Sequence, residues 1–145
     1  MNKGFWSALI FLLLVLSAKV YAAPIPENMA VKVIVSEASD QGLKGMICVA
    51  EVIRKRGSIK GFSGYKRYGW VNEPKSVWDL AKRAWEQSKY TNYTKGADHF
   101  ISVHTSSIPS WLRYCVKTYE YKDHIFFKEI YHRHNNGFWG FSPPL

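Results

Sequence analysis

Hydrophobic positions recur with helical spacing in the first half of the chain. Asn28 is of a residue type that caps helices, and Val31, Ile34 and Val35 follow it on one helical face, which predicts a first helix ending near Val35. A second helix is expected over residues 41–56. Its buried face would consist of Leu43, Met46, Ile47, Ala50 and Ile53, broadened by Val49 and Val52.

The spacing of residues in the second helix also predicts where its polar side chains lie. Glu51 is opposite the hydrophobic face and four residues before Lys55, so a surface ion pair is expected between them. Gly57 is expected to end the helix. Residues 57–72 are rich in Gly, Tyr and basic residues without a steady period, which predicts a long loop.

A third helix and a small sheet are expected in the second half. The helix would run from Pro74 to about Lys89, with a buried stripe of Val77, Leu80, Ala81, Ala84 and Trp85. A strand is expected from His99 to Val103, and a hairpin from segments 116–119 and 124–128 joined by a polar turn. These elements make one α+β domain, and residues 129–145 are expected to be a tail.

The first 22 residues have the pattern of an export signal. Lys3 precedes an almost wholly apolar run, and Val20-Tyr21-Ala22 offers a cleavage site after Ala22. An uncleaved membrane anchor stays open as an alternative, because the apolar segment approaches the length of about 20 residues that spans a bilayer. Residues 23–30 would then form a leader, and the protein would act in the periplasm, the cell envelope or the medium.

Composition points to a sugar or nucleic-acid ligand. The chain has 6 Trp, 9 Tyr and 8 Phe, and flat aromatic faces stack on sugar rings and on bases. The net charge is +9, and +7 once Lys3 and Lys19 are removed with the signal, which attracts polyanions. The basic residues are scattered in short runs, so a solvated surface also explains them, and no nucleic-acid partner is expected.

Glu37 is the candidate acid. It lies in a short polar break, Ser36-Glu37-Ala38, where it would end one helix and face across a bend. Apolar neighbours such as Val35 and Met46 would disfavour its charged form and raise its pKa, which suits a general acid near neutral pH. A solvated glutamate at a helix end is the alternative that position alone leaves open.

Three later motifs place the segment that begins at Glu37 in a wider pattern. Glu37 is followed by Gly42, Gly45, a hydrophobic run and Arg56. Later come Gly96-Ala97-Asp98-His99-Phe100, then Pro109-Ser110-Trp111, then His124-Ile125-Phe126. In this order the motifs resemble the SleB-like cell wall hydrolases, over residues 31–128.

The resemblance implies a lysozyme-like or lytic-transglycosylase-like α+β scaffold and one essential glutamate, which is Glu37 by motif. It implies cleavage of peptidoglycan glycan strands between N-acetylmuramic acid and N-acetylglucosamine. We also expect a monomer and no cofactor. Since no second carboxylate stands out as a partner, a lytic transglycosylase fits better than a water-using glycosidase. The residues expected to bind substrate are Tyr65 and Trp70 in the long loop, together with His99, Trp111 and His124 from the motifs.

Other features leave alternatives open. Cys48 and Cys115 could form a disulfide after export or could both be buried thiols. No metal site is expected, because the five histidines do not match a zinc pattern and His132-x-His134 lacks a third ligand. A catalytically silent peptidoglycan-binding or inhibitor module is the alternative function, and a secreted nucleic-acid-binding protein is a more distant one.

Overall fold

The computed structural model describes residues 23–62, 64, 69–133 and 139–141. The side chains of residues 69–70, 131–133 and 139–141 are outside this description. Residues 1–22, which carry the predicted signal or anchor, lie outside it as well. Among the described residues, no helix combines the length and the apolar character needed to cross a bilayer.

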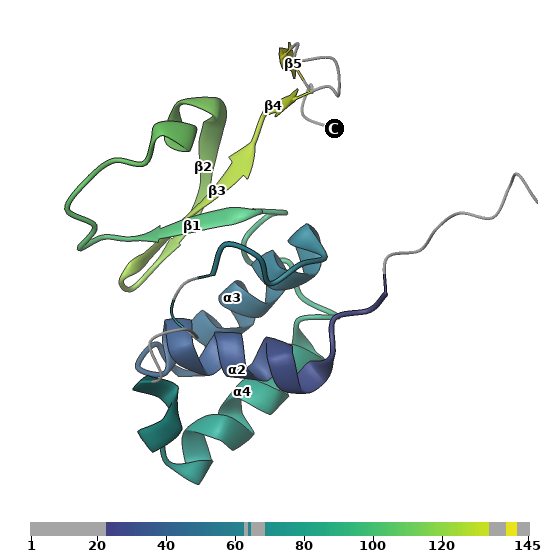
Figure 1. The fold of residues 1–145 in the computed structure, drawn as a ribbon, viewed down its shortest axis with the longest axis vertical. Coiled ribbons are helices and arrows are strands. Elements are labelled where there is room, and N and C mark those ends of the chain that lie inside the picture. The colour runs from purple at the N-terminus through teal and green to yellow at the C-terminus, as the bar shows by residue number, and fades with distance from the viewer. Residues whose placement is uncertain (1–22, 63, 65–68, 134–138, 142–145) are drawn as a thin grey trace, which may run out of the picture.

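Three helices pack together and form one side of the molecule (Figure 1). They are α2 (Glu27–Ala38), α3 (Gly42–Arg56) and α4 (Lys75–Gln87), with a short 3-10 helix, η2 (Gly69–Asn72), before α4. Their hydrophobic stripes meet in a core in which Ile34, Val49 and Ile53 are completely buried. The periodicity of the sequence therefore predicted all three helices correctly.

The ends of these helices follow from local chemistry. Gly57 closes α3 with a φ of 62°, and its N–H donates to the carbonyls of Ile53 and Arg54, as its position predicted. Proline 74 precedes α4 at the N-cap, where its missing N–H costs nothing. The start of α2 was predicted less well, because Pro26 and not Asn28 occupies the N-cap. The first turn of α2 therefore lies within the segment predicted to be a leader.

A three-stranded antiparallel sheet covers the helices, with strand order β1-β3-β2. The strands are β1 (His99–Ser102), β2 (Cys115–Tyr121) and β3 (His124–Glu129), and a second 3-10 helix, η3 (Ser110–Tyr114), leads into β2. β3 is central, and its Phe126 is fully buried against the helical core between Phe100 and Tyr119 on the neighbouring strands. The α+β fold class and the predicted hairpin are thus confirmed.

The segment predicted as a tail contains more structure than expected. β3 continues to Glu129, and the backbone of β4 (Tyr131–Arg133) pairs with that of β5 (Trp139–Phe141) in a separate two-stranded sheet. This sheet lies beyond the end of β3, away from the helices (Figure 1). The turn-forming residues between the two strands lie outside the described residues.

Glu51 corrects one prediction made from periodicity. It is 7% exposed, and its carboxylate accepts hydrogen bonds from the N–H groups of Tyr93 and Thr94 and from the hydroxyl of Thr94, at 2.7–3.0 Å. The loop after α4 folds over the face of α3 that was expected to meet solvent. Glu51 therefore fixes that loop and is not part of a surface pair with Lys55.

The cysteines are both free thiols. Cys48 is completely buried and is part of the core. Burial raises the pKa of the Cys48 thiol to about 12 and that of Cys115 to about 11. Neither the disulfide nor a thiolate nucleophile is present in this structure.

Candidate active site

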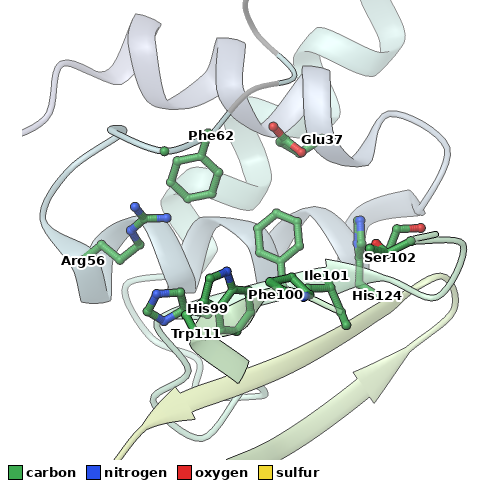
Figure 2. Close-up of a pocket in the computed structure, with 12 residues that line it drawn as sticks. Glu37, Arg56, Phe62, His99, Phe100, Ile101, Ser102, Trp111 and His124 are labelled. Atoms are coloured by element: carbon green, nitrogen blue, oxygen red, sulfur yellow. The ribbon is translucent and has the colours of Figure 1, made fainter. Parts of the chain in front are cut away.

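A cleft of about 630 Å³ lies between the helices and the sheet. Figure 2 shows Glu37 and Phe62 on the helical side, with Phe100 on the sheet side. Arg56 lies toward one end of this view, and His124 with Ser102 toward the other. The described residues that line the cleft are Glu37, Arg56, Gly61, Phe62, His99, Phe100, Ile101, Ser102, Thr105, Pro109, Trp111 and His124.

Glu37 lies at the end of a helix as predicted, but it belongs to the last turn of α2, which continues to Ala38 and not only to Val35. The turn is anchored by Ile34, Val35 and Ala38, which are all buried, whereas Glu37 itself is half-buried and faces the cleft. Its carboxylate therefore lines a cleft that also contains aromatic rings. The raised pKa expected for Glu37 stays a prediction.

One backbone contact orients the Glu37 carboxylate. The N–H of Gly64 donates to Oε1 at 2.7 Å. A Cβ at position 64 would lie 2.7 Å from Oε1 and 2.9 Å from the carbonyl oxygen of Ser36, which is closer than atoms can pack. Only glycine lets the loop approach the carboxylate this closely.

His99 and Trp111 form an aromatic surface in the cleft. Their ring centroids are 4.7 Å apart and the rings are tilted by 34°. The edge of Trp111 also meets Phe127 of β3, with centroids 6.1 Å apart. Two motifs separated along the chain thus meet in one platform of the kind that stacks on the flat face of a ring.

Asp98 holds the histidine of this platform in place. Its Oδ1 is 2.8 Å from Nδ1 of His99 and accepts a hydrogen bond from the N–H of Glu129 at 3.0 Å. Burial alone would raise the pKa of Asp98, but these hydrogen bonds outweigh it and the pKa is lowered. Asp98 is therefore an ionised carboxylate that positions His99, and it is not among the residues lining the cleft.

His124 begins β3 and pairs with Ser102 of β1 and Tyr121 of β2. It is 6% exposed and packs edge-on against the ring of Phe100, with centroids 4.9 Å apart. Burial lowers the pKa of His124, although Asp40 and Asp123 oppose the shift. His124 is thus a neutral wall residue, and its buried Nδ1 has no hydrogen-bond partner among the described residues.

Two of the predicted binding residues could not be placed in the cleft. Tyr65 lies outside the described residues, and only the backbone of Trp70 is described, as part of η2. The described part of the same loop does reach the site, because Phe62 and Gly64 both contact it. The long loop is therefore a wall of the cleft, and the roles of Tyr65 and Trp70 stay predictions.

Arg56 and Phe62 line the cleft but were not predicted as site residues. The Arg56 guanidinium carbon lies 4.7 Å from the centroid of Phe62. Arg56 looked like one member of the basic run Arg54-Lys55-Arg56, although it also closes the opening motif that begins at Glu37. That motif position was the available signal for it.

The chemistry of this arrangement is that of a proton donor and acceptor beside a bound ring. Glu37 is the only carboxylate among the described residues that line the cleft. Around it are aromatic rings, hydroxyl groups from Ser102 and Thr105, and one guanidinium. Within the described part of the chain, no three His, Cys, Asp or Glu side chains converge on a point that could hold a metal ion.

Comparison with solved structures identifies two similar folds. The catalytic domain of the SleB protein of Bacillus cereus matches with a TM-score of 0.59 and 17% identity, over 76% of this chain and 100% of that domain. The catalytic domain of the germination-specific lytic transglycosylase SleB of Bacillus anthracis matches with a TM-score of 0.50 and 19% identity, over 75% of this chain and all of that domain. No protein-family model and no curated protein matches the sequence. The resemblance inferred from the three motifs is therefore confirmed at the level of the fold.

Proposed function

We propose that this protein cleaves the glycan strands of peptidoglycan between N-acetylmuramic acid and N-acetylglucosamine, as a lytic transglycosylase with Glu37 as its acid and base. The observation that carries the proposal is the position of Glu37, the one carboxylate among the described residues that line an aromatic cleft. The similarity in fold to a lytic transglycosylase of Bacillus anthracis supports it.

In the first step, protonated Glu37 donates its proton to the glycosidic oxygen. The bond between that oxygen and C1 of the muramic acid breaks, and positive charge develops on C1 and the ring oxygen. Proton transfer from a positioned side chain typically contributes 10²- to 10⁴-fold to such a rate. The ionised carboxylate that remains lies where it can stabilise the cationic sugar.

In the second step, Glu37 takes a proton from the 6-hydroxyl of the same muramic acid. The oxygen O6 attacks C1 and closes a 1,6-anhydro ring, and Glu37 is protonated again for the next turnover. No water is consumed. The Gly64 N–H on Oε1 favours the ionised form that this step needs.

The distribution of the other acids supports a single-carboxylate mechanism. Water-using glycosidases usually place two carboxyl groups about 5–9.5 Å apart across the bond. Here Asp98 is committed to His99, and Asp40 and Asp123 hold the side chain of Gln41 outside the cleft. None of these three carboxylates lines the cleft beside Glu37.

The aromatic platform supports a sugar as the ligand. His99 and Trp111 offer a stacking surface, and Ser102 and Thr105 offer hydroxyl groups for the polar edge of a ring. We infer that the protein is exported by residues 1–22 and acts as a monomer in the cell envelope or outside it, where this polymer is found.

The test is mass spectrometry of the soluble products that the mature protein releases from isolated peptidoglycan. Wild type should give muramic ends of the 1,6-anhydro form, and Glu37→Gln should give none. Glu86→Gln is the matched control, because Glu86 is an exposed acid that pairs with Lys89 away from the cleft. Reducing muramic ends would show hydrolysis instead. Binding without any product from wild type would favour the silent module.

A further inference from the structure

Arg56 is held rigidly at the edge of the cleft. Its guanidinium stacks on Phe62, and one of its N–H groups donates to the carbonyl oxygen of Lys60. Gly61, with a φ of 92°, packs so closely that a Cβ there would lie 2.8 Å from Nη2 of Arg56. A planar group fixed in this way has lost most of its side-chain freedom before any ligand arrives.

The same short segment connects Arg56 to the candidate acid. Gly61 contacts the guanidinium and Gly64, three residues later, contacts the Glu37 carboxylate. Three residues of chain span at most about 11 Å. Arg56 and Glu37 line the same cleft, and Figure 2 shows Phe62 between them.

The charge of Arg56 is not neutralised within the described part of the chain. No ion pair to Arg56 is found there, and Asp98, which attracts it at longer range, is engaged with His99. Burial lowers the pKa of the Arg56 guanidinium, although the charged form persists. Arg56 is also the only lysine or arginine among the described residues that line the cleft.

Arg54, two residues earlier on α3, shows what a structural arginine in this protein looks like. Its guanidinium carbon is 3.5 Å from the centroid of Trp85, and it donates to the hydroxyl of Ser88 and the carbonyl of Trp85, both at 2.7 Å. Arg54 thus joins α3 to α4. Within the described part of the chain Arg56 joins no second helix, and apart from the N–H bonded to Lys60 its guanidinium lines the cleft.

We propose that Arg56 binds the free lactyl carboxylate of muramic acid, so that the enzyme prefers glycan strands from which the stem peptides have been removed. This inference rests on the proposed function. A planar guanidinium matches a carboxylate with two parallel hydrogen bonds, and such charge-assisted bonds are about twice as strong as neutral ones. The lactyl group is attached directly to the sugar ring that the aromatic platform would hold, which favours it over more distant carboxylates of the peptide.

Whether the lactyl group is an amide or a free carboxylate determines which reaction must come before this one. In an intact strand that group is an amide of the stem peptide and carries no charge, so it offers Arg56 one neutral acceptor. Hydrolysis of the amide restores the carboxylate. An amidase that removes the peptide would therefore supply the substrate on which this enzyme works best.

The experiment compares two forms of one glycan preparation, with stem peptides intact and with stem peptides removed by an amidase. Wild type is expected to show a higher kcat/KM on the stripped strands by about 10- to 100-fold, the worth of a charge-assisted pair. Arg56→Gln should abolish that ratio, mainly by raising KM on the stripped strands. Arg56→Lys, which keeps the charge without the planar fork, should retain part of it.

Arg54→Gln is the matched control, because it should lower stability while leaving the ratio intact. Binding of both strands to variants in a Glu37→Gln background provides a readout that does not depend on turnover. If no strand is cleaved but Arg56→Gln still weakens binding of stripped strands alone, the proposed reaction fails and the carboxylate site stands. Equal losses on both strands, a loss confined to peptide-bearing strands, or no preference in wild type would overturn the inference.

Discussion

The backbone N–H of Gly64 donates a 2.7 Å hydrogen bond to Oε1 of Glu37 across 27 residues of sequence. Glu37 is placed by the last turn of α2, and Gly64 is placed by the loop that follows α3. The carboxylate is thus oriented by two segments that are far apart in the sequence. Its orientation depends on the absence of a side chain at position 64.

Gly64→Ala tests this relationship. The added methyl group would overlap the carboxylate oxygen and the Ser36 carbonyl, so either the loop or Glu37 must shift. A displacement of about 1 Å in a reacting group can cost about 10²-fold in rate, and we expect a fall in kcat of this order. Release of anhydro-muramic products from peptidoglycan would measure it.

Gly57→Ala is the control for the general cost of replacing a glycine. Gly57 has a φ of 62° and nothing within 4 Å of where its Cβ would lie. Alanine there should lower the free energy of unfolding by about 1–2 kcal/mol without changing kcat. If Gly64→Ala behaved in the same way as Gly57→Ala, the hydrogen bond to Glu37 would have no role in the reaction.

Local signals explain why the sequence predicts the helices and the hairpin so closely. The stripe from Met46 to Ile53 defines α3, and Gly57 supplies the left-handed residue that ends it. The hairpin of β2 and β3 follows from two short strands and the turn at Lys122, which has a φ of 48°. Each of these features depends on neighbours in sequence.

Features that depend on distant segments were missed. Glu51 looked exposed, because nothing near it in sequence indicates that Thr94 covers it. Arg56 looked like one charge of a solvated run, because only the fold brings Phe62 and Gly61 onto it. The cleft residues Glu37, His99, Trp111 and His124 were found only because three motifs occur together in order.

Glu51→Gln should destabilise the protein strongly. The amide can accept only through one oxygen, so its NH₂ group would face either the Tyr93 N–H, now bonded to Oε1, or the Thr94 N–H and hydroxyl, now bonded to Oε2. We expect a loss of roughly 2–4 kcal/mol in the free energy of unfolding, measured by urea denaturation. Lys55→Ala should change it by less than about 0.5 kcal/mol, since Lys55 is exposed. If both substitutions changed the free energy of unfolding by the same small amount, Glu51 would instead belong to a surface ion pair with Lys55.

His124 should make stability depend on pH in the acid range. Its pKa is lowered by burial, against the pull of Asp40 and Asp123, so the unfolded chain binds the proton more readily than the folded one. Stability should be complete above the ordinary pKa near 6.5 and should fall as the pH drops from there toward the folded pKa. The slope contributed by this group is at most about 1.4 kcal/mol per pH unit.

His124→Gln isolates that contribution from the other titrating groups, His104 beside Asp123 included. Urea midpoints of wild type and variant at pH 7.5 and 5.5 give the comparison. The variant should lose less stability than wild type between the two values. A larger loss in the variant would mean that folding raises the affinity of His124 for its proton, contrary to its burial.

Trp111 should contribute to binding the glycan more than to folding. It is a half-buried residue of η3, and the centroid of its ring lies 4.7 Å from that of His99. A smaller ring can therefore replace it without opening the core. Trp111→Phe should raise KM by roughly 2- to 12-fold, which corresponds to the 0.5–1.5 kcal/mol of an aromatic contact, with little change in kcat. Trp85→Phe is the control, because Trp85 is 6% exposed in the helical core and outside the cleft. Trp85→Phe should lower the unfolding midpoint and leave KM unchanged.

The platform would have no part in binding if Trp111→Phe lowered only stability, since His99 and Trp111 would then merely cover the edge of β3.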